Sequence, residues 1–357
     1  MKIIIVGQFG KESFGLHIKE ALESMGHKVV KCVSYINEPS NDNRNRITFL
    51  SKANRKLFEM GKYASKQART KVMRRIMHEV CSTEADLVIC TKDYFLNYEV
   101  EEIRERTHAR IALWYPDGIL SLGRATFLRA PYDAVFFKDS YVVDQLVKLY
   151  GKNAFYLPEC FSRTRHKPMH VDKADLEKYG CEVAMMGNLH SYRVTLLEQL
   201  SDYDLRIYGT KNPWWLDVGG IEECYTGTYV ADEEKAKAIA CAKIQLNTLH
   251  IGEVFSVNVR TFELAGAGGF QLCQEKADLP DLFVPDEEIV TYRTLADLRE
   301  KIDWYLLHED ERKKIASAGL KRAWRDHYYE LRLQRLLSMT FAENVSDSDR
   351  FDYKAMG

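Results

Sequence analysis

The chain has 357 residues, 46% of them hydrophobic, and a net charge of −1. This length exceeds a single typical core, so we expect two domains of about 150 residues each. The near-neutral charge excludes a global attraction to nucleic acid, and any such contact would need a local basic patch. The eight cysteines include no CxxC pair. That pattern argues against a disulfide framework or a zinc knuckle and indicates reduced thiols of the cytoplasm.

The start of the chain, MKIIIVG, turns polar at Gln8, before an apolar stretch as long as that of a cleavable signal is complete. No apolar run elsewhere approaches the length that spans a membrane. We therefore expect a cytoplasmic protein, with peripheral attachment to the inner membrane face as an alternative.

The first predicted elements are a strand at 2–6, a helix within 14–25 and a strand at 28–33, which together form a βαβ unit. The loop between the first strand and the helix contains Phe9 and Gly10. It lacks GxGxxG and resembles a phosphate cradle only weakly. Phe9 and Gly10 are predicted to lie on the side of an acceptor.

Residues 41–80 form a basic, largely helical insertion by composition, since eleven cationic residues face only Asp42, Glu59 and Glu79. A solvated helix face is the first interpretation. The alternatives are an acidic acceptor, an anionic membrane surface or another polyanion. The cationic residues are Arg44, Arg46, Lys52, Arg55, Lys56, Lys62, Lys66, Arg69, Lys71, Arg74 and Arg75.

Strand-like runs return at 86–90, 109–114, 134–137 and 154–157, with helical patterns between them. This alternation predicts a parallel, doubly wound sheet in an N-terminal domain of residues 1–160. Ligands of such sheets bind at the carboxyl ends of strands, which singles out Asp93, Tyr94 and Asp117. Pro116-Asp117-Gly118 is also an ordinary turn sequence.

The run 156–168 has the proline and basic content of an interdomain hinge, and the alternation then restarts. We expect a second Rossmann-like domain over residues 175–325, with strands at 182–186, 205–208 and 243–248. A helix at 326–341 is expected to pack back on the N-terminal domain, and residues 343–357 are expected to be disordered.

The stretch 253–272, EVFSVNVRTFELAGAGGFQL, contains a helix start and a glycine-rich exit. Ser256 and Asn258 are capping residue types for a helix at 259–265. The N-terminus of such a helix is an anion site, and Arg260 in its first turn adds a forked cation. Glu263, one turn later, suits a pair of sugar hydroxyls. The alternative is an ordinary capped surface helix.

Several segments carry a family resemblance in the right order: WYPDG near 114, VAMMGNLHSYR at 183, LRIYG at 205, IQLNTLH at 244 and NVRTFELAGAGGFQL at 258. Over residues 110–340 the chain resembles the CgeB-like, or spore-maturation-protein, branch of the group 1 glycosyltransferases. The resemblance implies a glycosyltransferase B fold, with two Rossmann-like doubly wound domains facing a cleft.

The resemblance further implies that the C-terminal domain binds a nucleotide diphosphosugar, while an acceptor approaches from the N-terminal domain. UDP, GDP and dTDP donors are not distinguished, and no other cofactor is implied. The donor-binding residues carried over are Asn188, Arg193, Tyr229, Val230, Asn247, Glu253, Ser256, Asn258, Arg260 and Glu263.

Many retaining relatives of this family carry two glutamates eight positions apart, whereas Phe255 stands eight positions before Glu263. Glu253 lies two positions earlier still, so retaining and inverting chemistry both stay open. An inverting enzyme needs a base, for which Asp117 is the first candidate and Asp93 the second. In a retaining enzyme these carboxylates would orient the acceptor.

The function predicted is metal-independent transfer of a hexosyl group to a hydroxyl of a glycan, a lipid-linked or another acceptor, in cell-surface polysaccharide, glycolipid or related glycan synthesis. Arg193 and Arg260 would stabilise the leaving diphosphate. Asp202-Tyr203-Asp204 spells a metal-binding DxD but precedes a strand, and His166, His170 and His190 are interpreted as surface histidines. The alternatives are a non-catalytic nucleotide-sugar-binding protein and a nucleotide-sugar epimerase or phosphorylase.

Overall fold

A computed structural model describes residues 1–33 and 49–353, apart from the side chains of 49–55 and 119. The chain divides into two compact units. Unit 1 consists of Met1–Leu157 and Glu330–Gly357, and unit 2 of Pro158–Tyr329.

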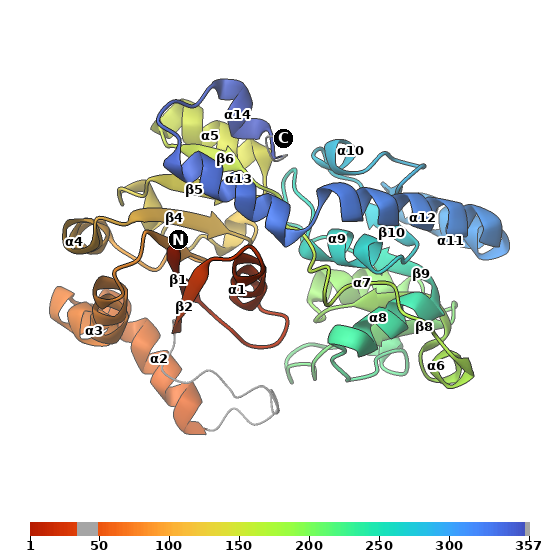
Figure 1. The fold of residues 1–357 in the computed structure, drawn as a ribbon. Helices are drawn as coiled ribbons and strands as arrows, with labels where there is room; N and C mark the ends of the chain where they lie inside the picture. The colour runs from red at the N-terminus through yellow and green to blue at the C-terminus, as the bar shows by residue number, and fades with distance from the viewer. Residues whose placement is uncertain (34–48, 354–357) are drawn as a thin grey trace. The chain divides into compact units, whose positions relative to one another are not determined.

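Unit 1 is built on a six-stranded, fully parallel sheet (Figure 1). Its strand order is β2-β1-β3-β4-β5-β6, so the direction in which the chain winds reverses between β1 and β3. The central strands are buried along almost their whole length, as their apolar runs predict. The strands are β1 (Lys2–Gly7), β2 (Lys28–Val33), β3 (Leu87–Cys90), β4 (Arg110–Tyr115), β5 (Ala134–Phe137) and β6 (Ala154–Tyr156).

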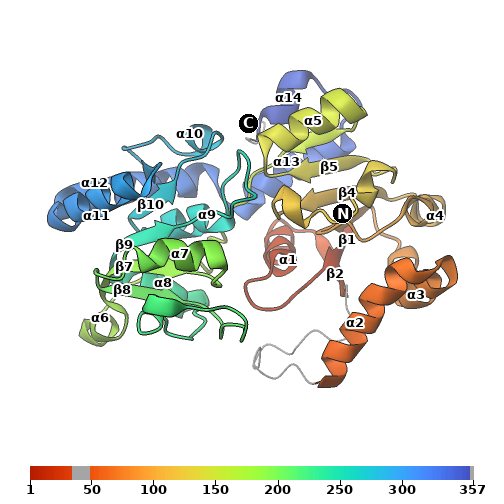
Figure 2. The same cartoon turned by 180° about the vertical axis from the view of Figure 1, so that it is seen from behind.

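Helices flank this sheet, and the end of the chain returns to it, with α13 and α14 beside α5 and β6 in Figures 1 and 2. The helices are α1 (Phe14–Ser24), α2 (Phe49–Ala64), α3 (Lys66–Ser82), α4 (Asn97–Thr107), α5 (Ser140–Tyr150), α13 (Tyr329–Phe341) and α14 (Asp347–Phe351). Two short 3-10 helices cover Ile119–Ser121 and Thr126–Leu128.

The segment expected to be disordered, 343–357, differs from that expectation through residue 353. It contains α14, whose Arg350 donates a hydrogen bond to Asn153 Oδ1 at 3.1 Å. Tyr353 is buried against Tyr156 and under Arg332. An aromatic anchor that packs on β6 therefore orders this segment, while residues 354–357 lie outside the described part.

The basic insertion forms two helices, α2 and α3, where it is described. Arg44 and Arg46, which belong to the same prediction, lie outside the described residues. Arg69 departs from the pattern of a solvated face, because it is buried and bonds both oxygens of Glu99, at 2.8 and 2.5 Å. It ties α3 to α4.

Unit 2 contains a second parallel sheet of five strands, in the order β11-β10-β9-β7-β8. One face packs against α7, α11 and α12, and the other against α6, α8 and α9. The strands are β7 (Cys181–Met186), β8 (Leu205–Tyr208), β9 (Ala242–Asn247), β10 (Gln271–Gln274) and β11 (Val290–Tyr292). The helices are α6 (Lys173–Tyr179), α7 (Ser191–Glu198), α8 (Asp232–Cys241), α9 (Val259–Gly266), α10 (Leu279–Leu282), α11 (Leu295–Leu307) and α12 (Glu309–Asp326), with a 3-10 turn at Gly219–Ile221. The prediction of two doubly wound α/β domains is confirmed.

The first residues of unit 2 form a strap across the end of α9. Phe161 exchanges backbone hydrogen bonds with His327 and Tyr329, and its ring lies under Gly266. A Cβ at Gly266 would meet that ring at 2.3 Å, so this position requires glycine. The C-terminal end of helix α9, which carries the predicted anion site at its other end, is thereby packed against the strap.

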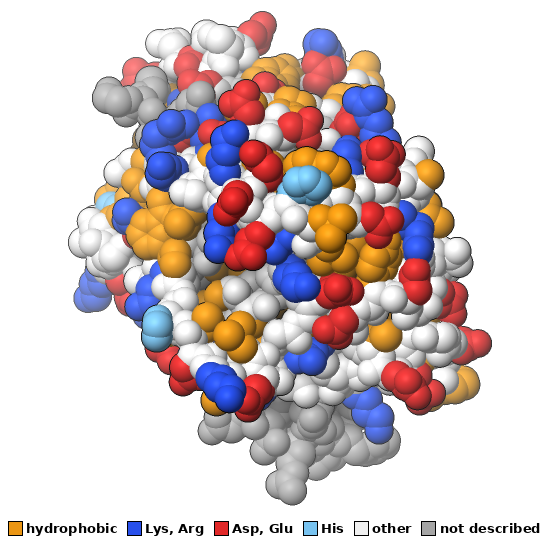
Figure 3. Space-filling view, turned by 90° about the vertical axis from the view of Figure 1, so that its right-hand side faces the viewer, with side chains coloured by type: hydrophobic (Ala, Val, Ile, Leu, Met, Phe, Trp, Pro, Cys, Tyr) orange, Lys and Arg blue, Asp and Glu red, His pale blue; other side chains and the backbone are white. Residues whose placement is uncertain are grey.

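The surface charges fit the near-neutral net charge, and the thiols fit the absence of a CxxC pair. On the face in Figure 3, acidic and basic side chains lie side by side among small hydrophobic patches. All eight cysteines are free thiols, and six of them are buried. Among the described residues, no helix has both the length and the apolar character required to cross a bilayer.

Candidate functional site

The winding of unit 2 reverses between β7 and β9, which are neighbours in the sheet. Open α/β sheets bind ligands at the carboxyl ends of the strands at such a point. The loop after β7 leads to Arg193 in α7, and the loop after β9 leads to Arg260 in α9. The topology therefore brings together two arginines that are far apart in the sequence.

Both guanidinium groups converge on the backbone of Gly187, directly after β7. A Cβ at this glycine would lie 2.8 Å from Arg260 Nη1 and 3.3 Å from Arg193 Nη1. The φ angle of Gly187 is +124°, which side chains rarely adopt. Two cations thus share one small space that only glycine leaves open.

The geometry of Arg193 is fixed within the protein. Its Nε donates to Thr248 Oγ1 at 2.9 Å, and its Nη1 donates to the carbonyl of Asn188. In the described part of the chain, neither Arg193 nor Arg260 makes an ion pair with a carboxylate, although Arg193 is 5% exposed. Burial, followed by the charge of Arg260, lowers the pKa of Arg193 to about 10. Two close cations without a counter-ion are the electrostatic signature of an anion site.

The N-terminus of α9 points its free amides at the same region. Asn258 is its N-cap, and its Oδ1 accepts a hydrogen bond from the amide of Thr261 at 3.2 Å. The Asn258 amide donates to Oδ1 of Asn247 at 3.0 Å, and Asn247 in turn donates to Thr261 Oγ1. Asn247 is fully buried. The structure therefore places both asparagines in the scaffold that orients α9.

The loop before α9 brings Glu253 and Ser256 together, since the Ser256 hydroxyl donates to Glu253 Oε2 at 2.7 Å. Both side chains are buried. Glu253 raises the pKa of Tyr192, although burial is the larger cause. Arg193 and Arg260 act on the pKa of Tyr192 in the opposite direction. The ten-residue spacing of Glu253 from Glu263 leaves the paired-glutamate interpretation open.

A small aromatic cluster borders the arginines. The His190 and Tyr192 rings are stacked 5.8 Å apart, and His250 meets Tyr192 edge-on at 5.2 Å. Burial lowers the pKa of His190, and the nearby charges of Arg193, His250 and Arg260 lower it further. Tyr192 and His250 were not predicted; their only sequence signal is that they follow β7 and β9.

Asn188 and the loop before α8 are arranged differently from the arginines. Asn188 Oδ1 accepts from the Thr210 hydroxyl at 2.8 Å and so ties the loops after β7 and β8 together. Val230 is buried and Tyr229 half-buried at the start of α8. Their roles in donor binding stay predictions.

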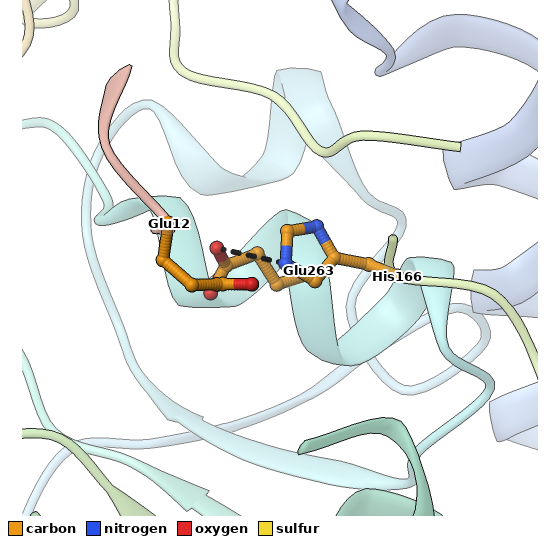
Figure 4. Close-up of side chains that lie close together, drawn as sticks. All are labelled: Glu12, His166 and Glu263. Carbon is orange, nitrogen blue, oxygen red and sulfur yellow. Dashed lines mark ion pairs between the residues drawn. The ribbon is translucent and has the colours of Figure 1, made fainter. Parts of the chain in front are cut away.

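Glu263 is buried in α9 within a charged cluster. Its Oε2 lies 2.8 Å from Lys235 Nζ. Its Oε1 lies 3.5 Å from His166 Nε2, as Figure 4 shows. The interpretation of His166 as a surface histidine is wrong, because its side chain is 1% exposed. Lys235 was missed, since nothing in the sequence shows that this lysine points into the protein. His170 and His190 are exposed, as expected.

The predicted acceptor-side residues lie in unit 1, largely at its own topological switch point. Phe9 and Gly10 follow β1, and Asp93 and Tyr94 follow β3, the adjacent strand. The close fit of the strand ends appears at Gly7, where a Cβ would lie 2.7 Å from Thr91 Oγ1. Phe9 and Tyr94 are buried. The sheet therefore groups these residues, and the roles assigned to them stay predictions.

The two candidate bases differ in environment. Asp117 lies at the surface in an ion pair with Lys92, at 3.3 Å, with both side chains more than 40% exposed. Asp93 is half-buried, and its Oδ2 accepts from the Thr126 hydroxyl at 2.8 Å. Oδ1 of Asp93 has no hydrogen-bond partner among the described residues. Burial raises the pKa of Asp93, against the opposing effect of Thr126. The environment of a general base is thus found at Asp93.

The DxD sequence at 202–204 lies before β8, away from the strand ends that bind ligands. Both oxygens of Asp202 accept hydrogen bonds from Arg299, at 2.9 and 2.5 Å. This aspartate joins the turn to α11, in line with the structural interpretation.

A family model matches part of the chain. Residues 193–338 match a family model described as "Glycosyl transferase-like". The matched range begins at Arg193 and includes Arg260 and Glu263.

Among curated proteins, the spore protein CgeB of Bacillus subtilis (strain 168) is 25% identical over 187 residues. The alignment covers 48% of this chain and 56% of CgeB, so the match spans about half the length of that relative.

Solved structures share the fold at low sequence identity. A sucrose-phosphate synthase from Thermosynechococcus elongatus superposes with a TM-score of 0.66 at 12% identity, covering 96% of this chain and 100% of that one. HepE from Anabaena, crystallised with UDP and glucose, gives a TM-score of 0.64 at 10% identity, with coverage of 95% and 99%. These are glycosyltransferase B folds, which confirms the expected fold. The match to CgeB, together with the family model, confirms the expected resemblance.

Proposed function

We propose that this chain, which resembles the CgeB-like glycosyltransferases and has their fold, transfers a sugar from a nucleoside diphosphosugar to an acceptor hydroxyl. One observation carries the proposal. Arg193, almost fully buried and without a carboxylate partner among the described residues, shares the space at Gly187 with Arg260 at the N-terminus of α9. A diphosphate supplies the charge that this site lacks.

The reaction breaks the bond between the anomeric carbon and the diphosphate oxygen and forms a bond from that carbon to the acceptor oxygen. Negative charge grows on the leaving diphosphate, where Arg193, Arg260 and the α9 amides would stabilise it by several kcal/mol. No metal is assigned to this step, so turnover is expected to persist in EDTA.

HepE has also been crystallised with UDP and with UDP-glucose, which makes UDP-glucose the first donor to test, ahead of GDP- and dTDP-sugars.

For an inverting reaction we propose Asp93 as the base that takes the acceptor proton, ahead of Asp117. A raised pKa brings a carboxylate closer to the working pH, where general bases are most effective. Asp117 forms an ion pair with Lys92 and is exposed to solvent. In a retaining reaction Asp93 would bind the acceptor hydroxyl instead.

The decisive experiment incubates the purified chain with radiolabelled UDP-, GDP- and dTDP-sugars, with and without a panel of glycan and lipid-linked acceptors. Donor-dependent product or slow donor hydrolysis is expected, and both should fall in Arg260→Ala. Tight donor binding without turnover would identify a binding protein. Conversion of the donor sugar without an acceptor would identify an epimerase.

For the acceptor side we propose contact with an anionic membrane surface through α2 and α3. Leu57 and Met60 are 64% and 61% exposed on α2. A hollow of about 780 Å³ on α3 is lined by Lys71, Val72, Arg74, Arg75, His78, Glu79 and Ser82. Exposed apolar groups next to basic ones suit anionic lipid headgroups.

The membrane contact is tested by co-sedimentation with phosphatidylglycerol vesicles in comparison with phosphatidylcholine vesicles. Binding should depend on the anionic lipid, weaken in high salt and fall in Lys71→Glu/Arg74→Glu. Equal binding to both kinds of vesicle, or none, would refute it.

A further inference from the structure

His190 lies at the N-terminus of α7, at the end of the loop that leads from β7 to Arg193. It is the N-cap residue, and its carbonyl accepts a hydrogen bond from the amide of Arg193 at 2.8 Å. Its side chain makes no capping hydrogen bond and is exposed. Among the residues that the structure describes, no group bonds its ring nitrogens. Both nitrogens are therefore open to a ligand from solvent.

Ring contacts hold the side chain of His190 beside the arginines. The ring stacks on that of Tyr192, with centroids 5.8 Å apart and planes 7° apart. His250 lies edge-on to both rings, 6.3 Å from His190 and 5.2 Å from Tyr192. The guanidinium of Arg193 lies 5.4 Å from the centre of the same tyrosine ring. One tyrosine thus contacts both the histidine and the arginine.

The charges around the His190 ring oppose its protonation. Burial is the largest cause of its lowered pKa, and the charges of Arg193, His250 and Arg260 follow. The N-terminus of α7, which has no acidic residue in its first turn, adds a partial positive charge. The same groups attract an anion, and a bound anion would reverse the sign of the potential at the ring.

The other titratable groups of this neighbourhood are less able to change charge. Nδ1 of His250 accepts a backbone amide at 2.9 Å, so this nitrogen already uses its lone pair. Oε2 of Glu253 accepts the hydroxyl of Ser256 at 2.7 Å. The pKa of Tyr192 is raised, mainly by burial, so its phenol keeps its proton. His190 is the side chain of this set that is suited to gain a proton near neutral pH.

We infer that His190 is a further ligand of the donor diphosphate and takes up a proton from solvent when that anion binds. This inference rests on the proposed function and deepens it. Arg193 and Arg260 supply two permanent charges, and His190 adds a third only when the anion is present. Affinity for the anion should therefore rise as the pH falls, because the protonated ring binds it more tightly. The charge that grows on the leaving diphosphate would favour the protonated ring further.

The test counts the protons that binding takes up. Titration calorimetry follows the binding of UDP-glucose near neutral pH in PIPES, MOPS and imidazole, which differ in ionisation enthalpy. The slope of the observed enthalpy against the buffer enthalpy is the number of protons taken up. The diphosphate of UDP-glucose is a diester and does not titrate in this range, so the proton must go to the protein. GDP-mannose and dTDP-glucose replace it if they bind more tightly, and sulfate is the probe without base or sugar.

Wild type should take up about half a proton or more for each bound ligand, and His190→Gln close to none. The Kd of His190→Gln should exceed that of wild type about three- to tenfold at acidic pH, and the two values should converge at alkaline pH. A merely structural role would weaken binding equally at every pH and leave the proton uptake in place. His170→Gln, another exposed histidine of unit 2, is the matched control and should keep the full uptake.

Two results would overturn the inference while leaving the proposed function standing. One is a wild-type protein that binds a nucleoside diphosphosugar without taking up a proton. The other is a His190→Gln protein that keeps the wild-type uptake. If the chain binds none of the three nucleotide sugars, the proposed function itself fails, and the inference with it.

Discussion

Replacing Arg193 by methionine should remove anion binding without unfolding the protein. Burial and Arg260 lower the Arg193 pKa from 12.5 to about 10. At about 1.36 kcal/mol per pKa unit, the folded state disfavours this cation by roughly 3 kcal/mol. A lowered pKa in a cation destabilises the fold at every pH below about 10, and the penalty fades as the pH rises through that value.

Methionine removes the penalty and also the hydrogen bonds to Thr248 and Asn188. These opposing changes are similar in size, so the melting temperature of the ligand-free protein should change little or rise. The affinity for anions should instead fall, because charge-assisted contacts to a phosphate contribute about 3 kcal/mol. The Kd for UDP or pyrophosphate should therefore increase roughly 100-fold.

The assay pairs thermal unfolding with calorimetric titration of UDP and pyrophosphate. Arg299→Met is the matched control, because this arginine also lies in unit 2 but pairs with Asp202 at the surface. Arg299→Met should leave the affinities for UDP and pyrophosphate unchanged. Unchanged affinity in Arg193→Met would refute the anion site, and a large drop in ligand-free stability would show that Arg193 is structural.

Five further substitutions test the contacts described above. Asp93→Asn should abolish transfer by an inverting enzyme while Asp117→Asn keeps most of it, and the wild-type rate should fall as the pH drops through the raised pKa of Asp93. Because the pKa of Asp93 is raised in the folded state, stability falls as the pH rises through that pKa. Asp93→Asn should therefore also raise the melting temperature at neutral pH, and a lowered melting temperature would contradict this. Gly187→Ala should weaken UDP binding, because its Cβ occupies the space between the guanidiniums and its φ of +124° is strained by about 1–3 kcal/mol; intact affinity would count against the geometry. Gly266→Ala should lower the free energy of unfolding by about 1–3 kcal/mol, because the new Cβ clashes with the Phe161 ring of the strap. Gly220→Ala, whose Cβ would meet open space, should change the free energy of unfolding by less than about 0.5 kcal/mol.

Alternating apolar runs were sufficient to predict most strands of both sheets, although not β11, whereas the family resemblance implied that Arg193 and Arg260 share one site. Parallel sheets place consecutive strand ends at one edge, so the order of elements already implies these neighbours. Residue type and spacing likewise predicted Asn258 as the cap of α9.

Packing between distant segments could not be predicted in the same way. Lys235 and His166 look like surface residues in the sequence, and their burial depends on how α8 and the strap meet α9. The surroundings of Asp117 and Asp93 could not be predicted either, because Lys92 and Thr126 reach these carboxylates from other segments of the chain. The ordered end of the chain depends on Tyr353 finding Tyr156, nearly two hundred residues earlier.

The return of the chain to unit 1 has a consequence for synthesis on the ribosome. Unit 2 occupies one continuous stretch, residues 158–329, whereas unit 1 needs residues 330–353 to complete the packing on β6. Synthesis of unit 1 therefore begins before that of unit 2, but unit 1 can complete its fold only after all of unit 2 has been synthesised. During translation, β6 stays uncovered until α13 and α14 emerge, while unit 2 can already be folded. Stalling before residue 330 should leave unit 1, and only unit 1, sensitive to protease.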